Sequence, residues 1–151
     1  MKPSPIYLDH AATTPVREEV FEAMKPFFGP RFGNPSSTHR WGREARAALD
    51  ESRERVARCI GAKPDEVCFT SCGTESDNWA ILGALEMTPD KDHIVTTRVE
   101  HEAVRKLCQR LEGRNYRVTW LEVDSDGQLD LEQLRGALDE KTAVVSVMLA
   151  N

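Results

Sequence analysis

The sequence predicts an α/β protein with a mainly parallel β-sheet, and three observations lead to this fold class. From residue 66 onward, short runs rich in β-branched residues alternate with longer runs of helical apolar spacing. Such alternation is typical of parallel sheets, because each helix returns the chain to the edge where the next strand begins. The last run, 143–148 (AVVSVM), is apolar throughout, which is typical of a strand covered on both faces.

The first 40 residues are predicted to be irregular apart from one helix. An extended piece and a turn over 7–15 lead into an amphipathic helix over 16–28, where proline and glycine residues end it. After a polar loop, apolar residues spaced by three, four and seven positions predict a long helix over 41–60. Gly61 follows it, in a position where glycine commonly ends a helix.

The alternating part of the chain supplies the remaining elements. The predicted strands are 66–70, 93–97, 117–123 and 143–148. The predicted helices are 74–85, 101–111 and 130–138. Because the buried type of strand comes last, three residues before the end of the sequence, we expect the sheet to continue in a longer protein.

Composition and charge exclude several function classes. No apolar run approaches the ~20 residues of a membrane span, and residues 1–6 lack the apolar region of a secretory signal. We therefore expect a soluble, cytoplasmic protein. The net charge is −5, and the arginines of 40–58 alternate with acidic residues as on a solvated helix face, so nucleic acid is not an expected partner. No two of the four cysteines have C-x-x-C spacing, which argues against a zinc site and a disulfide framework.

Three polar segments follow predicted strands, where ligands of parallel sheets collect. Residues 71–76 (SCGTES) could offer backbone N–H groups to a phosphate, or could form an ordinary turn into a helix. His101 could stack on a planar ligand or move a proton, or could simply begin a helix. Asn151 could donate to a ligand oxygen.

The other histidines and cysteines carry weaker expectations. His93 is expected to be exposed, because it follows Lys91 and Asp92. His10 and His39 lie in irregular segments from which either could reach a cleft. Cys59 and Cys108 fall on the apolar faces of predicted helices. Cys68, in a predicted strand, is expected in the core. The turn cysteine, 72, could lie near a ligand without being catalytic.

Six segments, in order and at matching intervals, resemble one known family. They are YLDHAATTPV, FGNPSSTHRWG, FTSCGTESDNWAI, TTRVEHEAV, D-x-D-G-Q-L-D-L and VVSVMLAN. Together they resemble the N-terminal part of a cysteine desulfurase of the class V aminotransferase family, most closely the nitrogenase-associated subtype. The resemblance covers essentially all 151 residues.

The resemblance implies an enzyme that depends on pyridoxal 5′-phosphate (PLP) and has the aspartate aminotransferase fold, fold type I. Members are homodimers that take sulfur from L-cysteine, leaving L-alanine and an enzyme persulfide for iron–sulfur cluster assembly. By the same resemblance, Gly73 and Thr74 match the positions that hold the PLP phosphate. His101 matches the histidine that stacks on the pyridine ring and assists proton transfer. Asn151 matches the first of an asparagine pair, of which the second contacts the cofactor.

The resemblance also implies how the chain divides and what it lacks. Residues 1–40 match a segment that packs with the small domain, and 41–151 match the first part of the large, PLP-binding domain. The Schiff-base lysine in its Ser-x-His-Lys segment, the aspartate of the pyridine nitrogen, the persulfide cysteine and the carboxylate-binding arginine have no counterpart in this sequence. Since the chemistry needs that lysine, this chain alone is not expected to turn over cysteine. The alternatives are a selenocysteine lyase or another class V relative, and an inactive fragment or one half of a split enzyme.

Overall fold

The computed structural model describes residues 5–150, which form two compact units divided between Cys68 and Phe69. The first unit contains α1 (Glu18–Met24), the 3₁₀ turn η1 (Lys25–Phe28), α2 (Arg40–Ile60) and the 3₁₀ turn η2 (Pro64–Glu66). The predicted helix over 16–28 is thus one short helix followed by a tighter turn that contains Pro26. The sequence-based division of the longer protein at residue 40 stays a prediction.

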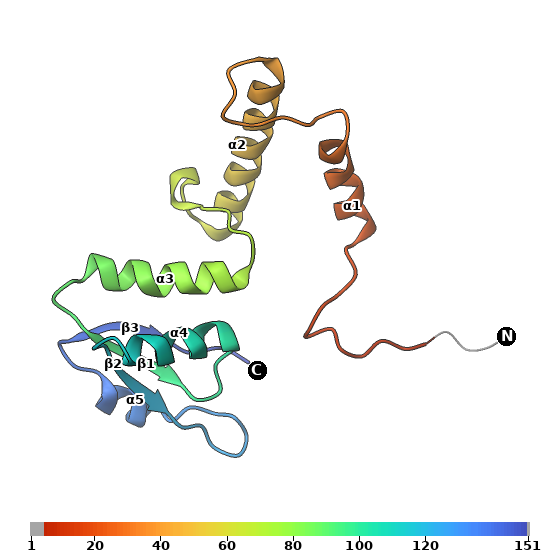
Figure 1. The fold of residues 1–151 in the computed structure, drawn as a ribbon. Helices are drawn as coiled ribbons and strands as arrows, with labels where there is room; N and C mark the ends of the chain where they lie inside the picture. Colours follow the sequence, from red (N-terminus) through yellow and green to blue (C-terminus); the bar gives the residue numbers. More distant parts are fainter. Residues whose placement is uncertain (1–4, 151) are drawn as a thin grey trace. The chain divides into compact units, whose positions relative to one another are not determined.

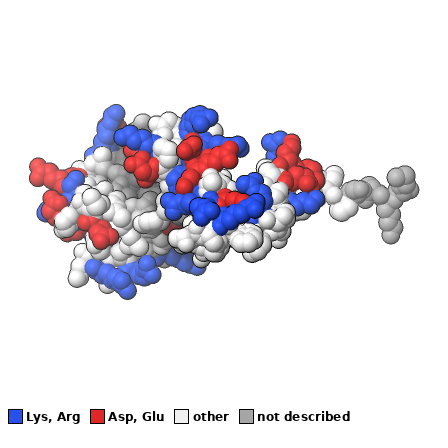
Figure 2. Space-filling view, turned by 90° about the horizontal axis from the view of Figure 1, so that it is seen from above, with Lys and Arg blue, Asp and Glu red and all other residues white. Residues whose placement is uncertain are grey.

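Helix α2 has the boundaries that the sequence predicts to within one residue. His39 caps its start, with Nδ1 accepting from the Gly42 N–H at 3.3 Å, and Gly61 ends it in the left-handed conformation at φ 69°. Arg40 pairs with Glu44 at 2.7 Å, and Arg46 pairs with Asp50 at 2.9 Å. These pairs one turn apart confirm a solvated helix face, and blue and red side chains lie side by side in Figure 2.

The polar loop before α2 packs closely onto the first turn of that helix. Gly42 is buried, and a Cβ there would collide with the backbone of Ser37. A Cβ at Gly33 would collide with the carbonyl group of Trp41. Glycine is therefore required at both positions by close approach of backbone to backbone.

The second unit is the α/β part of the chain (Figure 1). Its elements are α3 (Gly73–Met87), β1 (His93–Thr97), α4 (Glu102–Glu112), β2 (Arg117–Leu121), α5 (Leu131–Ala137) and β3 (Thr142–Ser146). The strands form a parallel sheet in the order β2-β1-β3. The central strand β1 is buried along its whole length. The predicted fold class, a mainly parallel α/β sheet, is confirmed.

Helices α3 and α4 cover one face of this sheet, and α5 lies on the other face against β2 (Figure 1). The core between α3, α4 and β1 is apolar. Its buried members are Ile81, Leu85, Ile94, Val104, Leu107, Cys108 and Leu111. Ala143 and Val144 of β3 pack against this core, whereas Val145 is 46% exposed. Of the two faces of β3, the one that bears Val145 is open among the described residues.

The predicted strand over 66–70 is wrong. Glu66 closes the turn η2, where its carboxylate accepts from the Lys63 N–H at 2.7 Å. The backbone at Val67 is extended, but the described sheet has three strands and residues 67–70 are not among them. The composition of this segment is typical of a strand, but a strand also requires a partner along its edge.

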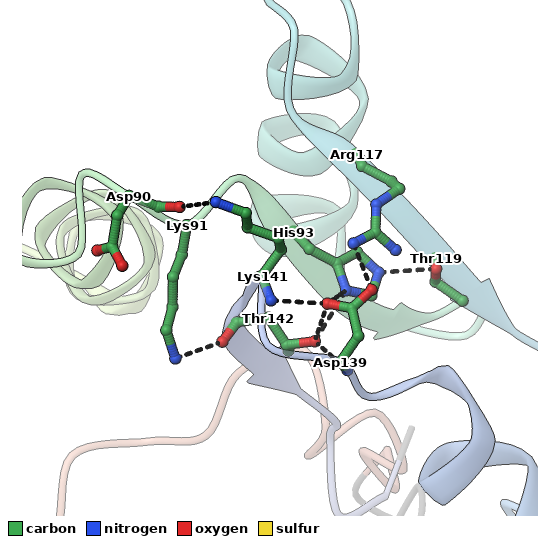
Figure 3. A network of polar contacts seen from close by, with 8 residues as sticks. All are labelled: Asp90, Lys91, His93, Arg117, Thr119, Asp139, Lys141 and Thr142. Carbon is green, nitrogen blue, oxygen red and sulfur yellow. Dashed lines mark hydrogen bonds and ion pairs between the residues drawn. The ribbon is translucent and has the colours of Figure 1, made fainter.

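The prediction that His93 is exposed is also wrong, because its side chain is fully buried at the start of β1. Its two ring nitrogens contact the hydroxyl groups of Thr142 on β3 and Thr119 on β2, as Figure 3 shows. The charged neighbour Lys91 turns away and donates to the Thr142 carbonyl at 3.2 Å. Polar partners on both flanking strands therefore allow a histidine to be buried here.

The prediction that Cys68 lies in the core is wrong as well. Cys59 and Cys68 are both exposed, whereas Cys108 is buried in the core as predicted. Few residues of the first unit are buried, and those of α2 are Gly42 and Ala57. The placement of Cys59 on an apolar helix face stays a prediction, and its side chain is exposed within this unit.

Candidate functional site

The site begins at the amino terminus of α3, where the structure places the segment 71–76. Cys72 is the extended N-cap residue, and Gly73 and Thr74 are the first two residues of the helix. The first N–H groups of an α-helix have no partner within the helix and carry its partial positive charge. A Cβ added to Gly73 would meet no atom within 4 Å. The first turn of α3 is therefore open to an anionic group.

Side chains fix the turn that leads into this helix. The Ser71 N–H and hydroxyl donate to one carboxylate oxygen of Glu75, at 2.6 and 2.7 Å. The hydroxyl groups of Thr70 and Ser76 lie 2.6 Å apart. These contacts hold the turn in shape while the Thr74 side chain stays exposed.

Cys72 lies in the same turn. The Glu75 N–H donates to its sulfur and the Ser71 hydroxyl oxygen lies 3.7 Å from it, and both contacts hold the pKa of this thiol below its usual range. A thiolate is favoured at a helix N-terminus because hydrogen-bond donors point at it. Cys72 is thus an exposed thiol in the turn directly before Gly73.

His101 is the N-cap of α4. Its Nδ1 accepts from the Ala103 N–H at 3.1 Å. This confirms that His101 begins a helix, and it also fixes the roles of the two ring nitrogens. Because Nδ1 is the acceptor, a neutral His101 carries its proton on Nε2. Nε2 is the ring nitrogen left to face a ligand.

The two helix starts lie together. Asn78 of α3 donates through Nδ2 to the Thr74 carbonyl at 2.8 Å and to the Ala103 carbonyl at 3.3 Å. A surface pocket of about 410 Å³ runs between α3 and α4. Its lining residues include Thr74, Asn78, His101, Glu102, Lys106 and Arg110. The structure therefore brings two of the predicted site residues, Thr74 and His101, into one pocket, with Gly73 directly before Thr74.

Several other candidates lie elsewhere. His39 caps α2, and His10 stacks edge to face on Tyr7 with ring centres 5.0 Å apart, both in the first unit. Asn151 lies outside the described residues. Sequence reasoning missed Asn78, although a polar residue four positions after Thr74 on the same helical face was a usable signal.

Comparison with known proteins places this geometry in a family. Residues 6–151 match the family Aminotransferase class-V. The chain belongs to this family. The chain is 52% identical over 147 residues to cysteine desulfurase IscS of Dictyoglomus turgidum, which covers 97% of this chain and 37% of that protein. It is 50% identical to cysteine desulfurase NifS of Azotobacter vinelandii, with the same two coverages.

Solved structures of relatives have the same fold. A NifS-like protein superposes with a TM-score of 0.88 at 41% identity, over 93% of this chain and 39% of that one. SspA in complex with cysteine superposes with a TM-score of 0.85 at 36% identity, over 93% and 41%. The expected fold, that of PLP-dependent class V aminotransferases, is therefore confirmed. The chain spans little more than a third of the length of the relatives that it matches.

The described residues also bear on membrane association. Among residues 5–150, the structure has no helix that is both long enough and apolar enough to cross a membrane.

Proposed function

We propose that this chain is the amino-terminal part of a cytoplasmic, homodimeric cysteine desulfurase and supplies the phosphate anchor and the ring-facing histidine of its PLP site. The main observation in support of this proposal is that Thr74, at the start of α3, and His101, at the start of α4, line the same pocket. Family members depend on PLP, and relatives named for cysteine desulfurase match almost the whole chain.

The residues present fit the cofactor at both of its ends. The opening above Gly73 leaves room for a phosphate at the N-terminus of α3, where the helix carries its partial positive charge, and the Thr74 hydroxyl adds a donor. Bound PLP supplies an electron sink for a carbanion at the substrate Cα. His101 contributes an Nε2 that can hold or move a proton, because its Nδ1 is engaged by Ala103.

The substrate and the sulfur acceptor extend this proposal. The reaction takes sulfur from L-cysteine, leaves L-alanine and passes a persulfide to an iron–sulfur scaffold or another acceptor protein. One structural relative is described in complex with cysteine, which supports the substrate. In the longer protein, residues 41–151 contribute to the large domain and residues 1–40 pack with the small domain. Without the family's lysine segment, the 151-residue chain by itself is expected to release no alanine from cysteine.

Binding of 4′-deoxypyridoxine 5′-phosphate tests the site in this chain. This analogue keeps the ring and the phosphate but has no aldehyde, so it cannot react with the surface lysines. Titration calorimetry is expected to show one site, and the Thr74→Val variant is expected to bind about tenfold more weakly, since a hydrogen bond to a charged group is lost. Thr88→Val, which removes a hydroxyl at the other end of α3, is the matched control. Absence of binding, or equal loss in both variants, would contradict the proposal.

A further inference from the structure

A buried acidic residue directly precedes His101. Glu100 is only 7% exposed, in the loop between β1 and α4. Its Oε1 accepts from the Met148 N–H at 2.7 Å and from the Thr97 hydroxyl at 3.3 Å. Burial of a carboxylate is costly unless donors satisfy it, so these contacts define the position of this side chain.

The two donors to Glu100 come from different strands. Thr97 is the last residue of β1, and Met148 follows the end of β3 at Ser146. Glu100 therefore joins the loop that carries His101 to the segment after β3 that leads, in sequence, to Asn151. Both segments leave the carboxyl edge of the sheet, where ligands of parallel sheets bind. The negative charge of Glu100 also acts on the buried thiol of Cys108. Burial is the main cause that raises the pKa of Cys108 to about 11, and the charge of Glu100 is the next.

We propose that Glu100 is a positioning residue: through the Met148 N–H and the Thr97 hydroxyl it fixes the loop before α4 and so holds the His101 ring in place for the phosphopyridine. The inference rests on the proposed function for the ligand, but the bridge itself is a property of this chain. The two hydrogen bonds from Met148 and Thr97 require an acceptor oxygen as far from the backbone as the glutamate carboxylate is. They do not require the negative charge as such.

Three substitutions at this position separate reach from charge. Glu100→Gln keeps the length and one acceptor oxygen, Glu100→Asp keeps the charge but shortens the side chain, and Glu100→Ala removes both. Hydrogen exchange of the Met148 amide reports on the bridge, and the ¹⁵N shifts of the His101 ring report on its cap and tautomer. Affinity for 4′-deoxypyridoxine 5′-phosphate reports on the site. Glu86→Ala, at an exposed position of α3, is the matched control.

In Glu100→Ala, Met148 exchange is expected to accelerate at least tenfold, the His101 ring shifts are expected to move toward those of a free histidine, and affinity is expected to fall about tenfold. Glu100→Asp should behave like the alanine variant, whereas Glu100→Gln should restore most of all three readouts. Glu86→Ala should change none of them. If Glu100→Ala does not fold, Thr97→Val removes one donor only and is expected to show the same changes at smaller amplitude.

The outcomes separate this inference from the proposed function. A folded Glu100→Ala variant with faster Met148 exchange but unchanged His101 shifts would overturn the positioning role and leave Glu100 a purely structural residue. Rescue by Glu100→Asp and not by Glu100→Gln would overturn it too, because charge and not reach would then matter. If the parent chain binds no 4′-deoxypyridoxine 5′-phosphate, the proposed function fails, while the exchange and ring-shift measurements still decide the role of Glu100.

Discussion

Nε2 of His93 lies 2.8 Å from the hydroxyl oxygen of Thr119. The other ring nitrogen lies 2.9 Å from the Thr142 hydroxyl, so one side chain connects all three strands (Figure 3). The Thr142 hydroxyl donates to the Asp139 carboxylate and accepts from the Asp139 N–H. Nδ1 of His93 is therefore the nitrogen that donates to Thr142, and Nε2 accepts from Thr119.

This arrangement predicts a pH-dependent stability. Burial lowers the pKa of His93 below its ordinary value of 6.5, and the nearby Arg117 guanidinium lowers it further. The unfolded chain then binds more protons than the folded chain as pH falls below about 6.5. The free energy of unfolding is expected to fall there, by at most about 1.4 kcal/mol per pH unit for this one proton. Urea unfolding between pH 8 and pH 5 measures this slope.

A His93→Gln variant is expected to have a flatter profile over the same range. His10→Gln, which changes an exposed histidine of the first unit, is the control and should keep the parent slope. Parallel profiles for the parent and His93→Gln would show that another group carries the pH dependence.

His101 is predicted to have two separable roles, as a helix cap and as a ring. His101→Ala loses the acceptor for the Ala103 N–H, and loss of an N-cap costs about 0.5–2 kcal/mol of stability. His101→Asn restores a capping oxygen and is expected to recover stability, but not affinity for 4′-deoxypyridoxine 5′-phosphate. Thermal unfolding and calorimetry on the same samples measure both quantities. Full recovery of affinity in the asparagine variant would rule out a role for the ring.

Gly73→Ala is predicted to spare the fold and to harm the site. A Cβ at this position meets no atom within 4 Å, and the backbone there is the start of a regular helix. Replacement of glycine by alanine at a compatible position stabilises by about 0.4–1 kcal/mol, through the unfolded state. The same methyl group would occupy the opening proposed for the phosphate. We expect Gly73→Ala to have unchanged or higher stability and to bind the analogue more weakly than the parent. Equal affinity in the variant and the parent would show that the phosphate binds elsewhere.

The cysteines are predicted to differ in reactivity. The pKa of Cys72 is lowered by donors in the first turn of α3, whereas burial raises that of Cys108 to about 11. Because the thiolate is the reacting species, iodoacetamide at pH 7 should label Cys72 far faster than Cys108. Peptide mass spectrometry follows the two sites. Saturation with 4′-deoxypyridoxine 5′-phosphate should slow Cys72 and leave the exposed Cys59 unaffected as the internal control.

The open face of β3 is predicted to promote self-association of this chain. Val145 is 46% exposed on an edge strand, and exposed apolar edges tend to pair with other chains. Val145→Lys is expected to reduce light scattering on concentration with little change in stability. Val16→Lys adds the same charge at an exposed valine of the first unit and should not have this effect. Equal improvement in both variants would assign the effect to net charge alone.

Features set by local chemistry were predictable from the sequence. Apolar spacing located α2 and α4 to within one residue, and alternation of element types indicated the parallel sheet. The resemblance singled out Thr74 and His101, and the structure places both in one pocket. The helix positions and the alternation of elements depend on residues that are close together in the sequence, and the two site residues lie in motifs that resemble those of a known family.

Features set by pairing between distant segments were not predictable. The burial of His93 depends on the hydroxyl groups of Thr119 and Thr142, which lie 26 and 49 residues further along the chain. The sequence around His93 does not indicate these partners. Residues 66–70 have a strand-like composition, but composition does not show which edge a strand would join. The burial of Glu100 was not predictable either, because an acidic residue before a helix usually faces solvent. The donors that satisfy it, the Met148 N–H and the Thr97 hydroxyl, come from two different strand ends.

The strand order also affects how the protein emerges from a ribosome. Strand β1 can pair with β2 once residue 121 has been synthesised, but its other edge pairs with a strand that begins at Thr142. During that interval β1, the most buried strand of the sheet, has one unpaired edge in the nascent chain. Because contacts distant in sequence form more slowly, this interval is when the growing polypeptide is most vulnerable to mispairing. A slower rate of translation between codons 121 and 146 would lengthen it.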